Sequence, residues 1–252
     1  MERWKGKVAI VTGASAGIGA AISEQLVNSG LKVVGLARRK EKLDNLAKTL
    51  HGKSGKFYGI KADICNEEDI LKAFNWAKEN LGPIHILINN AGLGRPTSLI
   101  EGDTSDFKKV LDTNVLGLTI CTREAVKDMR NNKIDGHIIH VNSVAGHYVP
   151  QVPNMNIYPA SKYAVTALTE TLRYELNFIG CRIKTTSISP GLVDTDIFLA
   201  NGYLVDNQTV ELLKMMPKLQ SKDVADAVLY ILGTPPHVQI TELTIRPVGE
   251  LP

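Results

Sequence analysis

The stretch "KVAIVTGASAGIGAAISEQLV" at residues 7–27 has the strongest structural signature in this chain. It opens with a short apolar run, passes through a turn that contains three glycines, and continues with the periodicity of an amphipathic helix. The free N–H groups and the partial positive charge at a helix N-terminus attract phosphate. A strand, a glycine-rich turn and a helix in this order therefore indicate a phosphate-binding unit.

The residues of this turn have separate structural tasks. Gly13 permits the tight turn, Gly17 lets the backbone approach a pyrophosphate, and Gly19 allows the helix to pack closely on the sheet. The glycines alone are also compatible with a turn that binds nothing, and the flanking strand and helix favour a nucleotide. The turn residues expected to contact it are Gly13, Ser15, Ala16, Gly17, Ile18 and Gly19.

Short runs rich in Val and Ile alternate with amphipathic stretches along the chain. Strands are expected within 7–13, 31–37, 56–62, 84–90, 137–143, 182–191 and 240–247, and helices at 17–29, 67–80, 105–131, 157–179 and 221–232. Near-continuous apolar strands are typical of a parallel sheet that is covered on both faces. The sequence therefore predicts an α/β protein, a single-domain Rossmann fold over residues 1–252. Its doubly wound seven-stranded parallel sheet carries helices on both faces.

Residues 192–220 depart from this alternation. The segment is long, apolar in patches, and interrupted by Gly202 and Pro217. We expect it to form a mobile lid over the substrate rather than an element of the core.

Composition limits the class of protein. The formal net charge is +3, and Lys and Arg are scattered among acids, which argues against nucleic acid or an anionic membrane as the main partner. The three isolated cysteines and the six histidines show no disulfide framework and no metal-ligand spacing. No targeting segment or membrane-length apolar run is visible, so we expect a cytoplasmic protein without stable membrane insertion.

The end of the second strand selects between two dinucleotides. An NAD site would place an acid there for the ribose 2′-hydroxyl, whereas this chain has Ala37 followed by Arg38 and Arg39. A guanidinium suits a 2′-phosphate, so NADP(H) is predicted; solvated arginines that open the next helix are the alternative. Asp63, followed by Ile64, could accept a hydrogen bond from an adenine amino group or could cap the next helix.

Two further features lie downstream. The fourth strand ends in "NNAG", whose backbone at Asn90, Ala91 and Gly92 could lie along the nucleotide. Asn114 interrupts the helical stretch 105–131, where asparagine and a nearby glycine lower the helix propensity. A kink there could free a backbone carbonyl for water, although helices also tolerate asparagine.

The remaining polar residues follow the fifth strand. Ser143 closes that strand, at the edge where such sheets bind ligands, and no Gly-x-Ser-x-Gly elbow surrounds it. Tyr158 and Lys162 are four residues apart, which places both side chains on one face of a helix. Such a pair alone is weak evidence for chemistry. His147 is an alternative acid, or a loop residue at the mouth of a pocket.

The sixth strand runs into "SPGLVDT" at 189–195. A turn at Pro190 and Gly191 could present the backbone of Val193 and the hydroxyl of Thr195 to a carboxamide.

Together, "TGASAGIG", "NNAG", Asn114, Ser143, "YPASK" and "PGLVDT" resemble, in this order and spacing, the short-chain dehydrogenase/reductase family over essentially the whole chain. More narrowly, "GLKVVGLARR", "ICTREA" and "YAVTALTETLRYEL" resemble the subfamily of the insect farnesol dehydrogenases and dehydrogenase/reductase SDR family member eleven.

The resemblance implies a role for each polar residue. Tyr158 would be the catalytic acid/base and Lys162 its modulator, which also holds the nicotinamide ribose. Ser143 would contact the substrate oxygen, and Asn114 would anchor a water in a proton relay. Ala16 departs from the basic residue that many NADP-dependent members carry in the glycine loop, so Arg38 and Arg39 would bear most of the 2′-phosphate recognition.

The tyrosine chemistry depends on its pKa. A free phenol, with a pKa near 10, is a poor base at neutral pH. An ammonium about 4 Å away contributes on the order of 4 kcal/mol at an effective dielectric constant near 20, before desolvation opposes it. We therefore expect Lys162 to bring the pKa of Tyr158 near neutrality.

Three functions compete at this stage. An NADP-dependent alcohol dehydrogenase or carbonyl reductase fits best; a nucleotide-sugar epimerase would be longer, and a silent dinucleotide-binding scaffold would have a broken catalytic set. The apolar lid residues and the resemblance favour an apolar alcohol or ketone, such as farnesol or a steroid ketone, over a small ketone.

Two helices have apolar residues beyond one stripe, so a second apolar face could be covered either by another subunit or by other elements of the same chain. The resemblance favours the first, a homotetramer or homodimer. These residues are Val110, Leu111, Leu116, Leu118, Ile120, Val165, Leu168, Leu172 and Leu176.

Overall fold

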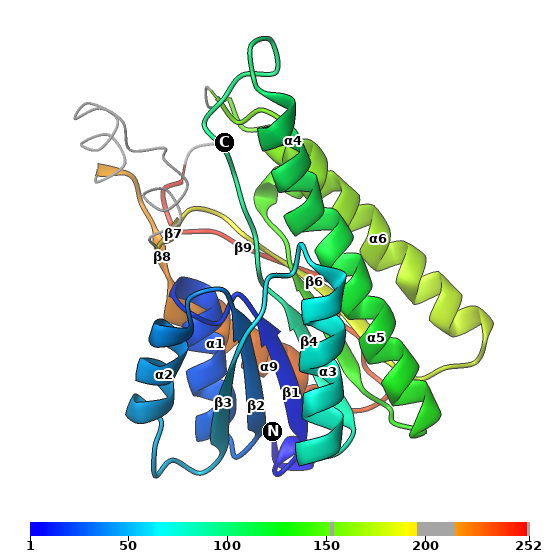
Figure 1. The fold of residues 1–252 in the computed structure, drawn as a ribbon. Helices are drawn as coiled ribbons and strands as arrows, with labels where there is room; N and C mark the ends of the chain where they lie inside the picture. The colour runs from blue at the N-terminus through cyan, green and yellow to red at the C-terminus, as the bar shows by residue number, and fades with distance from the viewer. Residues whose placement is uncertain (152–153, 196–214, 251–252) are drawn as a thin grey trace.

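The computed structural model describes residues 1–151, 154–195 and 215–250 (Figure 1). In these residues seven parallel strands form one sheet, in the order β3-β2-β1-β4-β5-β6-β9. The strands are β1 Val8–Thr12, β2 Lys32–Ala37, β3 Lys56–Lys61, β4 Ile84–Asn89, β5 His137–Val141, β6 Lys184–Pro190 and β9 Glu242–Ile245. The predicted doubly wound sheet is therefore confirmed, and each strand lies where the apolar runs placed it.

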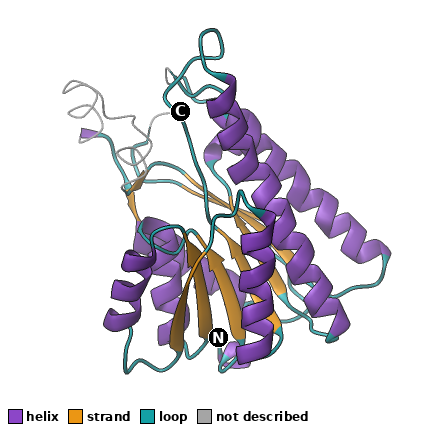
Figure 2. Cartoon of the chain, viewed as in Figure 1, coloured by secondary structure: helices purple, strands orange, loops and turns teal. Residues whose placement is uncertain are grey.

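Helices cover both faces of the sheet (Figure 2). They are α1 Gly17–Asn28, α2 Lys40–Thr49, α3 Glu67–Leu81, α4 Thr104–Leu111, α5 Leu118–Asn131, α6 Tyr158–Phe178 and α9 Ser221–Gly233. The stretch 105–131, expected as one helix, is divided into α4 and α5 by a π-helical segment, Asp112–Gly117. The prediction missed α2, because Leu43 is the only residue that this helix buries.

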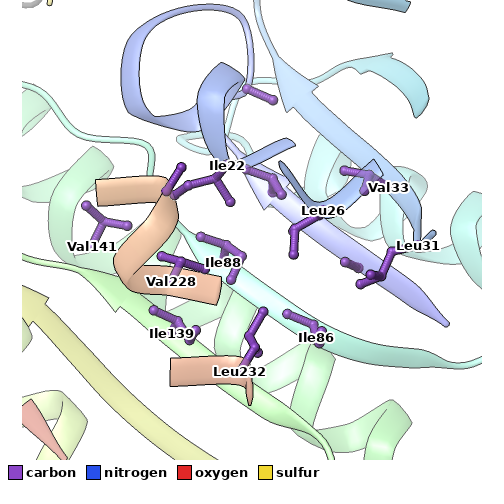
Figure 3. Close-up of a cluster of buried hydrophobic side chains, with 14 of the residues drawn as sticks. Ile22, Leu26, Leu31, Val33, Ile86, Ile88, Ile139, Val141, Val228 and Leu232 are labelled. Carbon is purple, nitrogen blue, oxygen red and sulfur yellow. The ribbon is translucent and has the colours of Figure 1, made fainter. Parts of the chain in front are cut away.

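Alternate residues of each strand enter different cores, because successive side chains point to opposite faces. Ala9 and Val11 of β1 pack with α1 and α9, in the cluster of Figure 3. Val8 and Ile10 pack instead with α3, α5 and α6 on the other face. A strand buried on both faces has no polar position, which explains the near-continuous apolar runs of the sequence.

The strand order reverses at β1, which pairs with β2 on one side and with β4 on the other. In such sheets the connections diverge at this point and leave a crevice beside the carboxyl ends of the strands. The glycine turn, the "NNAG" turn, Ser143 and the turn after β6 all leave from this edge.

Only the ends of the expected lid 192–220 can be described, because residues 196–214 lie outside the described part of the chain. Val193–Asp194 forms β7, which pairs in parallel with β8, Leu219–Gln220. The Lys218 ammonium also lies 3.3 Å from the Asp194 carboxylate. The two ends of the segment are therefore joined at its base, a pairing that the sequence did not indicate.

Strand β5 contributes two buried histidines to the interior. His137 lies 2.8 Å from the hydroxyl of Thr186, and His140 lies between the hydroxyls of Thr169 and Thr122, at 2.9 and 3.3 Å. Burial, with the nearby charge of Lys184, lowers the pKa of His137 to about 3. Burial, with the charge of Lys162, lowers the pKa of His140 to about 4. Both rings are therefore neutral in the folded protein at pH 7.

These two histidines should make the protein sensitive to mild acid. The unfolded chain binds a proton at each histidine near pH 6.5, whereas the folded chain does not until much lower pH, so stability is present above pH 6.5 and lost below it. Between pH 7 and pH 5 we expect the free energy of unfolding to fall by about 2 kcal/mol for each ring. Urea denaturation at the two pH values measures this loss.

Replacement variants separate these rings from other acid effects. His140→Gln should remove about half of the pH-dependent loss that the two rings cause, whatever its effect at pH 7. His51→Gln, at an exposed position, should leave the loss unchanged. An equal loss in wild type and in His140→Gln would contradict the assignment.

Candidate active site

The glycine turn between β1 and α1 has the form of a phosphate cradle. Helix α1 begins after Ala16, which is extended at φ −166° and offers no side-chain cap to the first N–H groups. Gly17 follows with φ +55°, a conformation that favours glycine. The uncapped helix N-terminus and the half-buried loop fit the diphosphate of a dinucleotide.

Asn90 of the "NNAG" turn holds the glycine turn in place. Its side-chain amide donates to the carbonyl oxygen of Thr12 at 2.9 Å and, at 3.3 Å, to that of Gly13. The Thr12 hydroxyl accepts in return from the backbone N–H groups of Asn90 and Ala91, at 3.0 Å each. A Cβ on Gly19 would lie 2.4 Å from the Asn90 amide nitrogen, so glycine is required at this position. Asn90 thus acts through its side chain, as a brace, which the sequence did not predict.

The two arginines after β2 lie beside the glycine turn. Arg39 donates from Nη2 to the Ser15 hydroxyl at 3.0 Å, so its guanidinium reaches over the loop. Arg38 is exposed, and Ala37 occupies the place of the acid that an NAD site would need. Arg38 and Arg39, here called the arginine rim, make this side of the glycine turn cationic.

Asp63 follows β3 and forms a tight local turn. Its carboxylate accepts from the backbone N–H of Cys65 at 3.0 Å. The alternative role as the cap of α3 is wrong, because Asn66 caps that helix by accepting from the backbone N–H of Glu68 at 2.9 Å. Ile64 is buried, and its carbonyl lies against the π-helical segment at Gly117.

Asn114 lies in the π-helical segment and is almost fully buried. Its amide oxygen accepts from the backbone N–H of Leu93, and its amide nitrogen donates to the Leu93 carbonyl, both at 2.8 Å. The same nitrogen donates to the Ser161 hydroxyl at 2.9 Å. The side chain is therefore committed to the protein, and any water that Asn114 anchors must contact its backbone carbonyl.

Tyr158 is the first residue of α6 and is half-buried. Its phenol lies near the Ser143 side chain, which follows β5. Asn156, which has φ +40°, accepts from the Tyr158 backbone N–H at 3.2 Å and donates to the Arg95 carbonyl at 2.7 Å. This asparagine, which the sequence analysis missed, ties the start of the helix to the loop after β4.

Lys162 is buried one turn further along α6. Its ammonium donates to the Val141 carbonyl at 3.1 Å and lies 5.8 Å from the centroid of the Tyr158 ring. Burial lowers the pKa of Lys162 to about 8. Lys162 and Asn114 both approach Gly92, since each would lie 3.8 Å from a Cβ at that position.

The expectation that Lys162 brings the pKa of Tyr158 near neutrality is wrong for this arrangement. Burial raises the pKa of Tyr158 above its usual value, and the hydrogen bond from Ser143 opposes this only in part. Desolvation disfavours both the phenolate and the ammonium, so the two groups face the same penalty. The ammonium also points at a backbone carbonyl and lies beside the ring.

The turn after β6 meets the glycine turn. Thr195 lies so close to Gly17 that a Cβ there would be 3.2 Å from its methyl group. Val193 is buried in β7, and Pro190 ends β6. His147 lies 2.9 Å from the Ser189 hydroxyl and 3.3 Å from the Glu242 carboxylate, at the junction of β6 and β9. It therefore has structural partners of its own.

The structure therefore brings the predicted residues to one edge of the sheet in two groups. One group surrounds the N-terminus of α1 and fits a dinucleotide; the other consists of Ser143, Tyr158, Lys162 and Asn114. Thr12, Asn156 and Ser161 were missed, and all three are hydroxyl or amide residues inside or beside the recognised motifs.

No group of three or more His, Cys, Asp or Glu side chains in the described residues could hold a metal ion. No helix in the part of the chain that the structure describes is long and apolar enough to cross a membrane.

Known proteins are similar in sequence to this chain over its full length. Farnesol dehydrogenase of Aedes aegypti is 49% identical over 252 residues, which cover 99% of this chain and 99% of that protein. Dehydrogenase/reductase SDR family member 11 of Bos taurus is 46% identical over 254 residues, all of both chains. The Homo sapiens protein of that name is 44% identical over 100% of this chain and 98% of its own.

Solved structures share the fold. A closed form of serine dehydrogenase complexed with NADP+ has a TM-score of 0.88 and 30% identity, over 97% of this chain and 96% of that one. An alcohol dehydrogenase of the archaeon Thermococcus sibiricus, complexed with 5-hydroxy-NADP, has a TM-score of 0.84 and 25% identity, over 98% of each chain. The family described as short chain dehydrogenase matches residues 7–202. On sequence, fold and site together, the chain belongs to the short-chain dehydrogenase/reductase family of oxidoreductases.

Proposed function

We propose that the protein is an NADP(H)-dependent oxidoreductase that interconverts an apolar alcohol and its carbonyl compound. The observation that carries the proposal is the placement of Tyr158 at the start of α6, one helical turn from the buried Lys162, whose ammonium lies 5.8 Å from the centroid of the Tyr158 ring. Ser143 and Tyr158 would both contact the reacting oxygen. Asn114 would hold the start of α6 in place through its hydrogen bond to Ser161.

Tyr158 has the task of moving one proton. When bound, the nicotinamide cofactor would supply or accept the hydride. In the reductive direction the Tyr158 hydroxyl would give its proton to the carbonyl oxygen, which becomes the alcohol. Since burial raises the pKa of Tyr158, the phenol is protonated at neutral pH and ready to act as the acid. Ser143 would orient the same oxygen by hydrogen bonding.

Different residues of the chain would bind different parts of the cofactor. The first N–H groups of α1 would bind the diphosphate, and Arg38 and Arg39 would bind the 2′-phosphate. Lys162 would hold the nicotinamide ribose, and the turn 190–195 would hold the carboxamide.

An apolar substrate is supported by sequence. The relative from Aedes aegypti is named for farnesol, an isoprenoid alcohol. Residues 192–220 of this chain include the apolar residues Ile197, Phe198, Leu199 and Leu212. We propose an isoprenoid alcohol such as farnesol, or a steroid ketone, as the class of substrate.

Steady-state assays test this function directly. The purified protein should oxidise farnesol with NADP+ or reduce a steroid ketone with NADPH, with a higher kcat/KM than for a small ketone such as acetone. Tyr158→Phe should lower kcat by roughly a hundredfold or more, because it removes the proton donor, and should bind NADPH within about threefold of wild type.

Tyr163→Phe is the matched control. Tyr163 lies on the same helix and its side chain is exposed, so this variant should keep wild-type kcat. If Tyr158→Phe kept a tenth of wild-type kcat, Tyr158 would not be the acid. NADPH binding without turnover of any alcohol or carbonyl would instead support a silent scaffold.

Cofactor selection should depend on the arginine rim. We expect kcat/KM with NADPH to exceed that with NADH, and Arg39→Gln to lower the NADPH value by about tenfold while NADH is little affected. Arg38→Asp should reverse the preference. Lys40→Gln is the control, because Lys40 pairs with Asp44 on the same helix. Equal values for the two cofactors in wild type would refute the NADP assignment.

Self-association is proposed from a set of residues that overlaps the sequence-indicated set only at Leu111 and Leu116. Most of the apolar residues expected at a subunit contact are covered by the same chain: Val110, Leu118, Ile120, Val165 and Leu176 are buried. Leu111, Leu116, Tyr163, Tyr174 and Phe178 remain exposed on the outer surfaces of α4 to α6. We propose that a second copy covers this surface in a homodimer or homotetramer.

Light scattering at micromolar concentration should therefore give two or four times the mass of the chain. Leu116→Glu, which places a charge on the surface, should lower that mass, whereas Ile100→Glu, in the exposed loop before α4, should not. A monomeric wild type would overturn the proposal.

A further inference from the structure

The segment that follows β9 returns to the turn after β6. The Glu250 carboxylate accepts from the backbone N–H of Leu192 at 2.8 Å. Its side chain is only 10% exposed, and a Cβ on Gly191 would lie 2.5 Å from it. Only glycine at 191 leaves room for the carboxylate, so these two residues are matched across 59 positions of sequence.

The second oxygen of the same carboxylate leads to another loop. Arg246 lies with its Nε 2.8 Å from Glu250, and its Nη2 donates to the hydroxyl of Tyr148. The guanidinium also lies 5.1 Å from the centroid of the Tyr148 ring. Tyr148 stands five residues after Ser143, in the loop between β5 and α6. Glu250 and Arg246 thus connect the turn after β6 with the loop after Ser143.

Burial makes this connection specific. A buried carboxylate needs partners, and Glu250 accepts a hydrogen bond from Leu192 at one oxygen, while its other oxygen makes an ion pair with Arg246 and has no hydrogen bond of its own within the described part of the chain. The backbone N–H of Gly191 donates to Ile245 at 2.8 Å, so the turn is held from the same side by β9. Gly249, next to Glu250, lies close to Pro217, which stands two residues before β8.

We infer that Glu250 is a positioning residue for the reaction. It holds the Gly191–Leu192 backbone, and with Arg246 it keeps that turn in register with the loop that follows Ser143. The inference rests on the proposed function in one respect, the assignment of the turn 190–195 to the nicotinamide. Glu250 itself would contact neither cofactor nor substrate.

Hydrogen exchange tests the contact without activity. In Glu250→Ala, peptides that cover 190–195 should exchange about tenfold faster than in wild type, because the N–H of Leu192 loses a charged acceptor. Glu250→Gln, which keeps an amide oxygen for Leu192, should recover most of the protection. Peptides from β1, β4 and β5 should be unchanged in both variants, which also shows that the fold is intact.

A kinetic split tests the positioning role. Glu250→Ala should lower kcat about fivefold or more and raise the primary deuterium isotope effect on kcat with 4-deuterated NADPH, because a misplaced turn slows hydride transfer. The KM for NADPH should stay within about threefold, since the α1 and arginine contacts are untouched. Val248→Ala, on the same segment at a fully exposed position, should match wild type throughout.

The outcomes are distinct. Unchanged exchange at 190–195 in Glu250→Ala, or an unchanged isotope effect with a general loss of stability, would overturn the positioning role. If wild type turned over no alcohol or carbonyl with either cofactor, the proposed function would fail, while the exchange data would still report on the contact of Glu250 with the turn.

Discussion

The hydrogen bonds of the Asn114 side-chain amide are the interactions on which the site depends most. This amide uses both its donor and its acceptor groups on Leu93 and Ser161, which belong to the loop after β4 and to α6. An amide is suited to this because it can donate and accept at once within one plane. The loop beside the dinucleotide, the π-helical segment and the helix of Tyr158 therefore share one buried anchor, and none of them can shift alone.

Burial, more than charge attraction, sets the proton chemistry of the site. Tyr158 and Lys162 are both displaced toward their neutral forms, as expected when desolvation acts on an acid and a base together. A neutral phenol beside Ser143 suits proton donation to a carbonyl. The reverse reaction needs a phenolate, whose stabilisation must come from positive charge close to the hydroxyl. In the protein as folded, the Lys162 ammonium instead donates to the Val141 carbonyl.

The strands, most helices and the family could be predicted from the sequence, because buried parallel strands and glycine turns have strong local signatures. The polar side chains that hold the turns and loops of the site together could not be predicted. Asn156 reads as an ordinary loop residue, and Glu250 finds its partner Leu192 far away in the chain. Helix α2 was not predicted because it buries a single leucine and so has little apolar periodicity. The pKa of Tyr158 was misjudged because the sequence does not show where the Lys162 ammonium points.

The π-helical segment has an evolutionary consequence for the helix that follows it. A π turn holds one residue more than an α turn. Because the π turn takes up this extra residue, α4 and α5 keep the relative rotation of a continuous α-helix that lacks it. Deleting one residue from 112–117 would therefore leave Cys121, Ala125 and Met129 packed on the sheet, but it would remove the widened turn that contains Asn114. The core thus tolerates either length of this segment, and the contacts of Asn114 with Leu93 and Ser161 are what require the longer one.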